Sequence, residues 1–83
     1  MFKWRKESYP GGVTYILESD QFPVFAHVGI WNNPDENNGK WYIHVGREVT
    51  FVSGSIETAQ RIAQHIAILH LSTAIQEISS LSL

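Results

Sequence analysis

The chain has 83 residues and a net charge of −2, from eight acidic and six basic side chains. This balance excludes a general electrostatic attraction to nucleic acid or anionic lipid, and the absence of cysteine excludes disulfides and thiolate metal sites. A hydrophobic content of 43% is typical of a globular protein and too high for a disordered one.

The length, with no internal repeat and no long linker, predicts a single domain over residues 1–83. A core of this size supplies about 3–5 kcal/mol of net stability before any partner is counted. We find no secretory signal and no apolar run of about 18 residues. The sequence therefore predicts a cytoplasmic protein without a membrane segment.

Residues 2–52 have the pattern of β-strands separated by turns. Apolar and polar residues alternate over residues 2–7 and again over 13–19, on either side of a Pro-Gly-Gly turn. A third strand is predicted over residues 24–31. The polar segment 32–39, rich in asparagine, then predicts a loop.

A fourth strand opens at Trp41, and the turn that ends it allows two registers. A two-residue turn pairs Val45 with Glu48, whereas a three-residue turn pairs Val45 with Val49. The longer turn keeps the apolar residues of the last two strands on one face, so we expect that register.

Residues 55–81 read as a helix with Ser55 as its N-cap. One apolar stripe recurs at helical spacing and comprises Ala59, Ile62, Ala63, Ile66 and Leu69. We expect it to cover the sheet face made of Trp4, Tyr15, Leu17, Ala26, Val28, Ile43 and Phe51. The predicted fold class is α+β, a four- or five-stranded antiparallel β-meander with one long C-terminal helix packed on one face.

A second apolar stripe on the same helix consists of Ile68, Leu71, Ile75 and Ile78. One helix cannot bury both stripes against one small sheet. Three outcomes remain open: a homodimer through this segment, a helix that breaks near Ser72 and folds back, or a frayed tail. We favour the homodimer, because the last twelve residues carry a single charge, on Glu77. Leaving this apolar segment exposed to water would be unfavourable and would promote aggregation.

The sheet face away from the helix is expected to carry aromatic and imidazole side chains, from Phe25, His27, Trp31, Tyr42 and His44. Such rings are typical anchors for a partner protein. They are also typical of a platform that stacks single-stranded nucleic acid, with phosphate contacts from Lys3, Arg5, Lys6 and Arg47. The third alternative is an ordinary sheet surface, or one buried within a dimer, because strands favour aromatic residues in general.

No pattern in the sequence predicts catalysis or a cofactor. His65 and His70 are five residues apart, which is not the spacing of a two-histidine ligand pair on a helix. His27 and His44 could be neighbours across two strands, but no third ligand accompanies them. We therefore expect a non-enzymatic protein with neither metal nor cofactor.

The apolar and aromatic placements resemble those of short proteins encoded by phages and prophages, which read as a β-meander with one covering helix. The residues that carry the resemblance are Trp4-Arg5, Tyr15-Ile16-Leu17, the segment from Val24 to Val28, Lys40-Trp41-Tyr42-Ile43, Phe51 and the helix opening Ile56-Glu57-Thr58-Ala59. The resemblance implies an accessory or inhibitor protein that acts by binding a host protein. It implies no particular site residue.

These observations together predict a small protein-interaction module. It would be dimeric through its C-terminal helix and would present the open aromatic face or the acidic 32–39 loop to a partner protein. Binding of single-stranded nucleic acid through the same face is the alternative.

Overall fold

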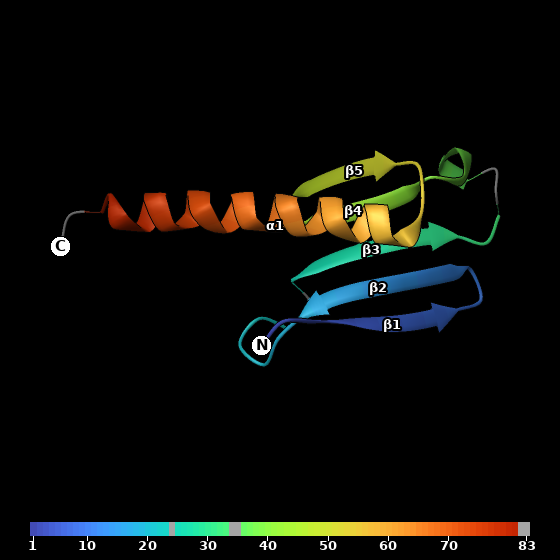
Figure 1. Ribbon diagram of the computed structural model, residues 1–83, viewed down its shortest axis with the longest axis horizontal. Coiled ribbons are helices and arrows are strands. Elements are labelled where there is room, and N and C mark those ends of the chain that lie inside the picture. Colours follow the sequence, from blue (N-terminus) through green and yellow to red (C-terminus); the bar gives the residue numbers. More distant parts are fainter. Residues whose placement is uncertain (24, 34–35, 82–83) are drawn as a thin grey trace.

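A computed structural model describes residues 1–23, 25–33 and 36–81. They form an open five-stranded antiparallel sheet with one long helix lying across one face (Figure 1). The predicted α+β class and the β-meander are confirmed.

The strands lie in the sheet in the order in which they occur in the chain, so each pairs with the next. They are β1 (Lys3–Tyr9), β2 (Gly12–Glu18), β3 (Ala26–Trp31), β4 (Trp41–Val45) and β5 (Glu48–Val52), and the helix α1 (Ile56–Ser79) follows them.

Two of the predicted element boundaries differ from those in the structure. The third strand begins at Ala26 rather than at Val24, which lies outside the described residues. The predicted polar loop contains a short 3-10 helix, η1 (Glu36–Gly39), and its Pro34 and Asp35 also lie outside the described residues.

The turn between β4 and β5 has two residues, so the expected three-residue register is wrong. Val45 pairs with Glu48 across the hairpin. Gly46 has φ +59°, the left-handed conformation that a two-residue hairpin turn requires at its first central position. The local demand of the turn therefore outweighs the hydrophobic pattern. The two-residue turn places Val49 and Phe51 on the sheet face that points away from α1. The prediction that Phe51 packs under the helix is therefore wrong.

The helix packs on the sheet through a line of alanines. Ala59, Ala63 and Ala67 are buried one turn apart, and they join a core that contains Leu17, Ala26, Val28, Ile43 and Val45. Small side chains let the helix axis approach the sheet closely. Leu69, which we expected in this stripe, is 52% exposed instead. The predicted N-cap is confirmed, since Ser55 Oγ accepts a hydrogen bond from Thr58 N at 3.2 Å.

The helix does not break near Ser72, and it does not fold back. It continues to Ser79 and projects beyond the end of the sheet (Figure 1). Every residue from Ser72 to Ser79 is exposed. We call this segment, residues 72–79, the helix overhang.

Candidate binding surface on the open sheet face

The face of the sheet away from α1 is built in rows that the strand register fixes. One row runs through Ile16, His27, His44 and Val49. The next row runs through Thr14, Gly29, Tyr42 and Phe51. Both expected histidines and Tyr42 are therefore on the open face, and Arg5 continues the first row on β1.

Four of these side chains, together with Trp31 on β3, surround a shallow hollow of about 170 Å³. Its lining consists of Trp31, Tyr42, His44, Val49 and Phe51, and we call it the aromatic hollow. Trp31 is 39% exposed and Phe51 is 47% exposed, so both rings present apolar surface to solvent. The Trp31 and Tyr42 ring centroids are 6.2 Å apart, which is a contact distance for aromatic side chains.

Tyr42 is held flat against the sheet. Its ring lies directly over Gly29, where an added Cβ would collide with the ring and the hydroxyl. The Tyr42 hydroxyl is 2.9 Å from Thr14 Oγ1, which is itself 2.7 Å from the Tyr9 hydroxyl. Burial raises the pKa of Tyr42, so the phenol is neutral near pH 7. The floor of the hollow is therefore fixed before anything binds.

His27 and His44 meet edge to face beside the aromatic hollow, with ring centroids 5.7 Å apart. Burial, together with the nearby His44, lowers the pKa of His27, so this imidazole is uncharged near pH 7. Within the described residues, no group of three histidine, cysteine or acidic side chains is placed to hold a metal ion.

Phe25 lies apart from Trp31 and Tyr42, but it lines a hollow of about 170 Å³ together with His27, His44 and Gly46. It forms a cluster with Phe2 and Phe22, with ring centroids 5.6 to 5.9 Å apart. The cluster sits at the end of the sheet where α1 leaves it, and Phe25 contacts the helix side of the core. Phe25 is therefore connected to the rest of the predicted partner-binding set through His27 and His44, and His44 also lines the aromatic hollow.

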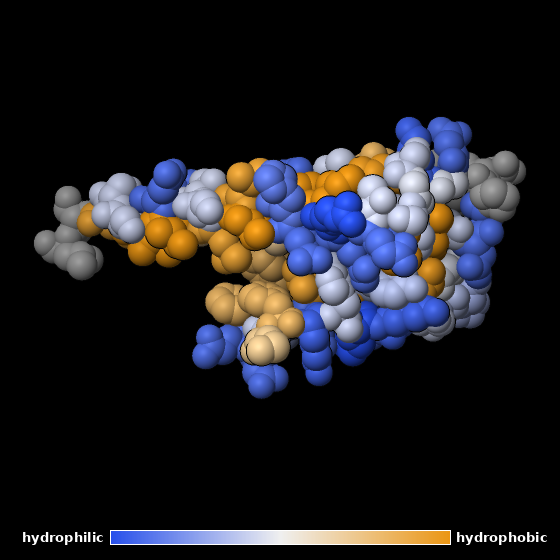
Figure 2. Space-filling view, viewed as in Figure 1, coloured by the Kyte–Doolittle hydropathy of each residue, from blue (hydrophilic) through white to orange (hydrophobic). Residues whose placement is uncertain are grey.

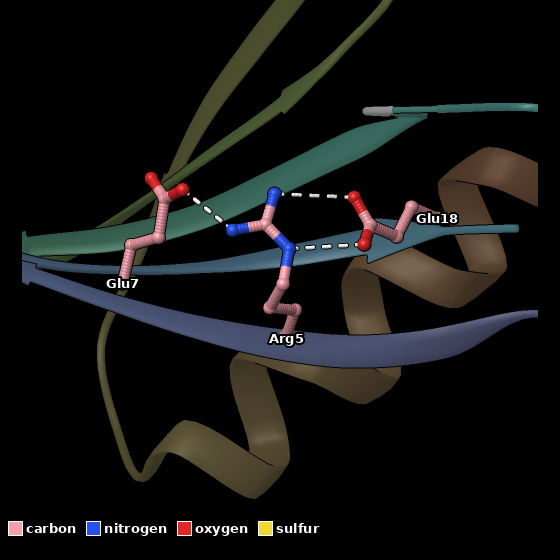
Figure 3. A network of polar contacts seen from close by, with 3 residues as sticks. All are labelled: Arg5, Glu7 and Glu18. Atoms are coloured by element: carbon pink, nitrogen blue, oxygen red, sulfur yellow. Dashed lines mark hydrogen bonds and ion pairs between the residues drawn. The ribbon is translucent and has the colours of Figure 1, made fainter.

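The four basic residues proposed as phosphate contacts do not form one track. Arg5 donates from Nε to Glu18 Oε2 at 2.9 Å and from Nη2 to Glu18 Oε1 at 3.2 Å, and it also pairs with Glu7 (Figure 3). These bonds raise the pKa of Arg5 and lower that of Glu18. The Arg5 guanidinium is therefore already paired with two carboxylates and is not available as a free phosphate contact.

The other three are scattered. Lys6 is on the helix side of β1, with its amine 5.9 Å from the centre of the Tyr15 ring. Arg47 lies in the β4–β5 turn, toward the edge of the sheet opposite β1. Lys3 is directly opposite Glu18 in the register. The open face is therefore close to neutral.

Val49 and Phe51 are the two residues of the aromatic hollow that sequence reasoning missed. The wrong register had placed them on the covered face. The signal that could have found them is Gly46, since a glycine at the first central position favours the two-residue turn.

Comparisons with known proteins identify no relative: no family model, no curated protein and no solved structure matches this chain. Among the described residues, no helix has the length and apolar character needed to cross a bilayer.

Proposed function

We propose that this protein is a small, non-catalytic binding module that holds a partner protein on the aromatic hollow. The observation that carries the proposal is the group of exposed rings around a fixed floor. Aromatic side chains in a defined pocket supply most of the energy of many protein interfaces. Because Tyr42 is already immobilised by Thr14 and Gly29, little side-chain entropy is lost when a partner binds.

The charge around the aromatic hollow favours a protein over a nucleic acid. Binding to single strands needs a positive groove that follows the phosphates. Here Arg5 is neutralised by Glu7 and Glu18, and the lowered pKa of His27 keeps that side chain uncharged. An apolar side chain of a protein partner is the better fit to this surface.

The resemblance to short phage-encoded proteins adds a class of partner to the proposal. In that class the partner is a host protein whose activity is blocked or redirected when it is bound. Such a role needs a surface and no catalytic group.

Phe51→Ala is the substitution that tests the proposal. Phe51 is exposed and makes no hydrogen bond through its side chain, whereas Tyr42 also supports the sheet. Leu69→Ala is the matched control, because Leu69 is 52% exposed on α1, away from the open face. The measurement is affinity capture from a lysate of the source organism with wild type and both variants, with the captured proteins identified by mass spectrometry.

We expect a defined protein to be captured by wild type and by Leu69→Ala, and its affinity for Phe51→Ala to be at least about 30-fold weaker, the effect of losing 2 kcal/mol at an interface anchor. Equal capture by all three proteins would exclude the aromatic hollow as the binding surface. A labelled single-stranded oligonucleotide serves as a second probe. Binding that weakens steeply with salt and is lost in Phe51→Ala would establish the nucleic-acid alternative instead.

A further inference from the structure

The helix overhang and the turn before it carry an apolar stripe that the described chain leaves largely exposed, with Leu71 alone partly buried. Ile68, Ile75 and Ile78 are 59, 64 and 68% exposed. With Leu71 they are spaced three, four and three residues apart, the repeat by which one helix packs along another. Soluble monomers rarely leave a continuous apolar surface of this kind in water.

The composition of the helix overhang also indicates that it needs a partner. Of its eight residues, Ser72, Thr73, Ile75, Ile78 and Ser79 rank below the strong helix formers such as Ala, Leu, Lys, Gln and Glu. In proteins, most helical stability comes from burying an apolar face rather than from intrinsic propensity. An overhang that stayed in water would lack the stabilisation that comes from burying an apolar face, and only Ala74, Gln76 and Glu77 would add strong helix propensity.

The stripe runs without interruption into a groove beside the phenylalanine cluster. The groove has a volume of about 150 Å³ and is lined mainly by Phe2, Leu17, Phe25, Ala67, Ile68 and Leu71. Figure 2 shows apolar surface along the projecting helix and over the end of the sheet beneath it, with a hollow between them. One side of the helix therefore presents a single apolar surface from the groove to its C-terminal end.

We propose that this surface binds a second copy of the same chain, with the two helix overhangs packed antiparallel. From Ile68 to Leu81 the sequence has one acidic residue, Glu77, and no lysine or arginine. Two copies therefore meet without charge repulsion, and the surface offers no charge pattern that would select a different partner.

An antiparallel arrangement matches the stripe to itself. With the two-fold axis midway between Leu71 and Ile75, Ile68 of one copy lies against Ile78 of the other, and Leu71 lies against Ile75. Symmetry repeats both layers, so each of the four stripe residues is covered. The end of each helix then reaches the mouth of the other copy's groove, beside Phe25.

The position of the phenylalanine cluster favours the antiparallel arrangement over a parallel one. Phe2 and Phe25 line the groove together with Ile68 and Leu71, so they occupy the side of α1 along which a parallel partner helix would run. The antiparallel pair places the two sheets at opposite ends of the assembly.

The area of contact is the second reason for including the groove. The segment from Ile68 to Leu81 is about 20 Å long at 1.5 Å per residue. A stable interface buries about 800 Å² on each partner. Since one helical seam of this length is short for that area, filling the other copy's groove adds the contact that a stable dimer needs.

The inference is tested by light scattering after size-exclusion chromatography of the full chain at about 100 µM. We expect wild type to have twice the 9.4 kDa chain mass and Ile75→Lys to have the mass of one chain. Leu69→Lys is the control, because it adds the same charge to an exposed leucine on the other side of the helix, and we expect it to stay dimeric. Far-UV circular dichroism confirms that each variant is folded. A monomeric wild type, or a dimeric Ile75→Lys, would overturn the proposal.

The orientation has a separate test, which the absence of native cysteine makes free of background. We expect Leu71→Cys and Ile75→Cys proteins, mixed and oxidised, to form a disulfide with each other, and each to form little disulfide when oxidised alone. Efficient cross-linking of each variant with itself would show a parallel pair and would contradict the antiparallel arrangement. Because the aromatic hollow lies on the opposite face of the sheet, neither test depends on the proposed function.

Discussion

Gly29 is the residue on which the floor of the aromatic hollow depends. Any side chain at this position would meet the Tyr42 ring, which lies over the glycine and is bonded to Thr14. Gly29 is therefore required because it leaves room for the Tyr42 ring of the neighbouring strand β4, and not because its own backbone needs a glycine conformation.

We predict that Gly29→Ala lowers the free energy of unfolding by about 1–2 kcal/mol, because the Tyr42 ring must swing away and lose its hydrogen bond. The measurement is guanidinium denaturation monitored by tryptophan fluorescence. Gly11→Ala is the control, since a Cβ there comes no closer than 3.7 Å to the Trp31 ring, and we expect unchanged or slightly raised stability. An equal loss in both variants would refute this role for Gly29.

His27 gives the fold a pH dependence whose sign follows from its burial. The lowered pKa means that the folded protein binds this proton less readily than the unfolded chain does. Protonation therefore favours unfolding, and stability falls as the pH drops below the ordinary histidine pKa of about 6.5 and on toward the lowered value.

We predict that the melting temperature decreases between pH 7.5 and 5.5, and that His27→Gln reduces this slope. The exposed His65 provides the control substitution, His65→Gln, which should leave the slope as it is in wild type. If the melting temperature fell equally with pH in wild type and in His27→Gln, His27 would not contribute to the pH dependence of stability.

Gly46 illustrates why the candidate site could be predicted only in part. The alternation of residues along β3 and β4 was enough to assign His27, Trp31 and Tyr42 to one face. The outer half of the aromatic hollow depends on a single turn, and a change of one residue in its length inverts the whole of β5. A hydrophobic pattern cannot decide such a turn when it competes with the φ angle of one glycine.

At the scale of the elements, the helix shows what periodicity predicts well and what it leaves out. The spacing of Ala59 and Ala63 identified the covered face correctly. It did not show that Ala67, rather than Leu69, completes the buried line: the buried line follows positions four residues apart, and Leu69 lies about 120° around the helix axis from it. Leu69 therefore faces solvent because of its position on the helix, and the alanines that do face the sheet let α1 approach it closely.

We predict that Ala63→Leu destabilises the protein by about 1–3 kcal/mol, because Ala63 has no exposed surface and the helix would have to move away from β3 and β4. Urea denaturation measures the loss. The control is Thr73→Leu, which places the same side chain on the exposed helix overhang and should change stability by no more than about 0.5 kcal/mol. If both substitutions had the same small effect, the alanine line would not be what positions the helix.

At the scale of the whole molecule, the helix overhang makes the protein elongated, 51 × 24 × 18 Å. Its radius of gyration is 14.4 Å, whereas a compact chain of this length has about 12 Å. The fold class was predictable because five short alternating segments and one long helical segment allow few arrangements. The projection of the helix was not, because sequence alone does not say where a sheet ends beneath it.

The order of strands in the sheet has a consequence for how quickly the protein forms. Every strand pairs with its neighbour in the chain, so each hairpin closes a short loop. Chains with such local pairing fold faster than sheets whose strands come together from distant parts of the sequence. The sheet can therefore assemble one hairpin at a time, and among the described elements the docking of α1 onto β3 and β4 is the main step that joins distant parts of the sequence.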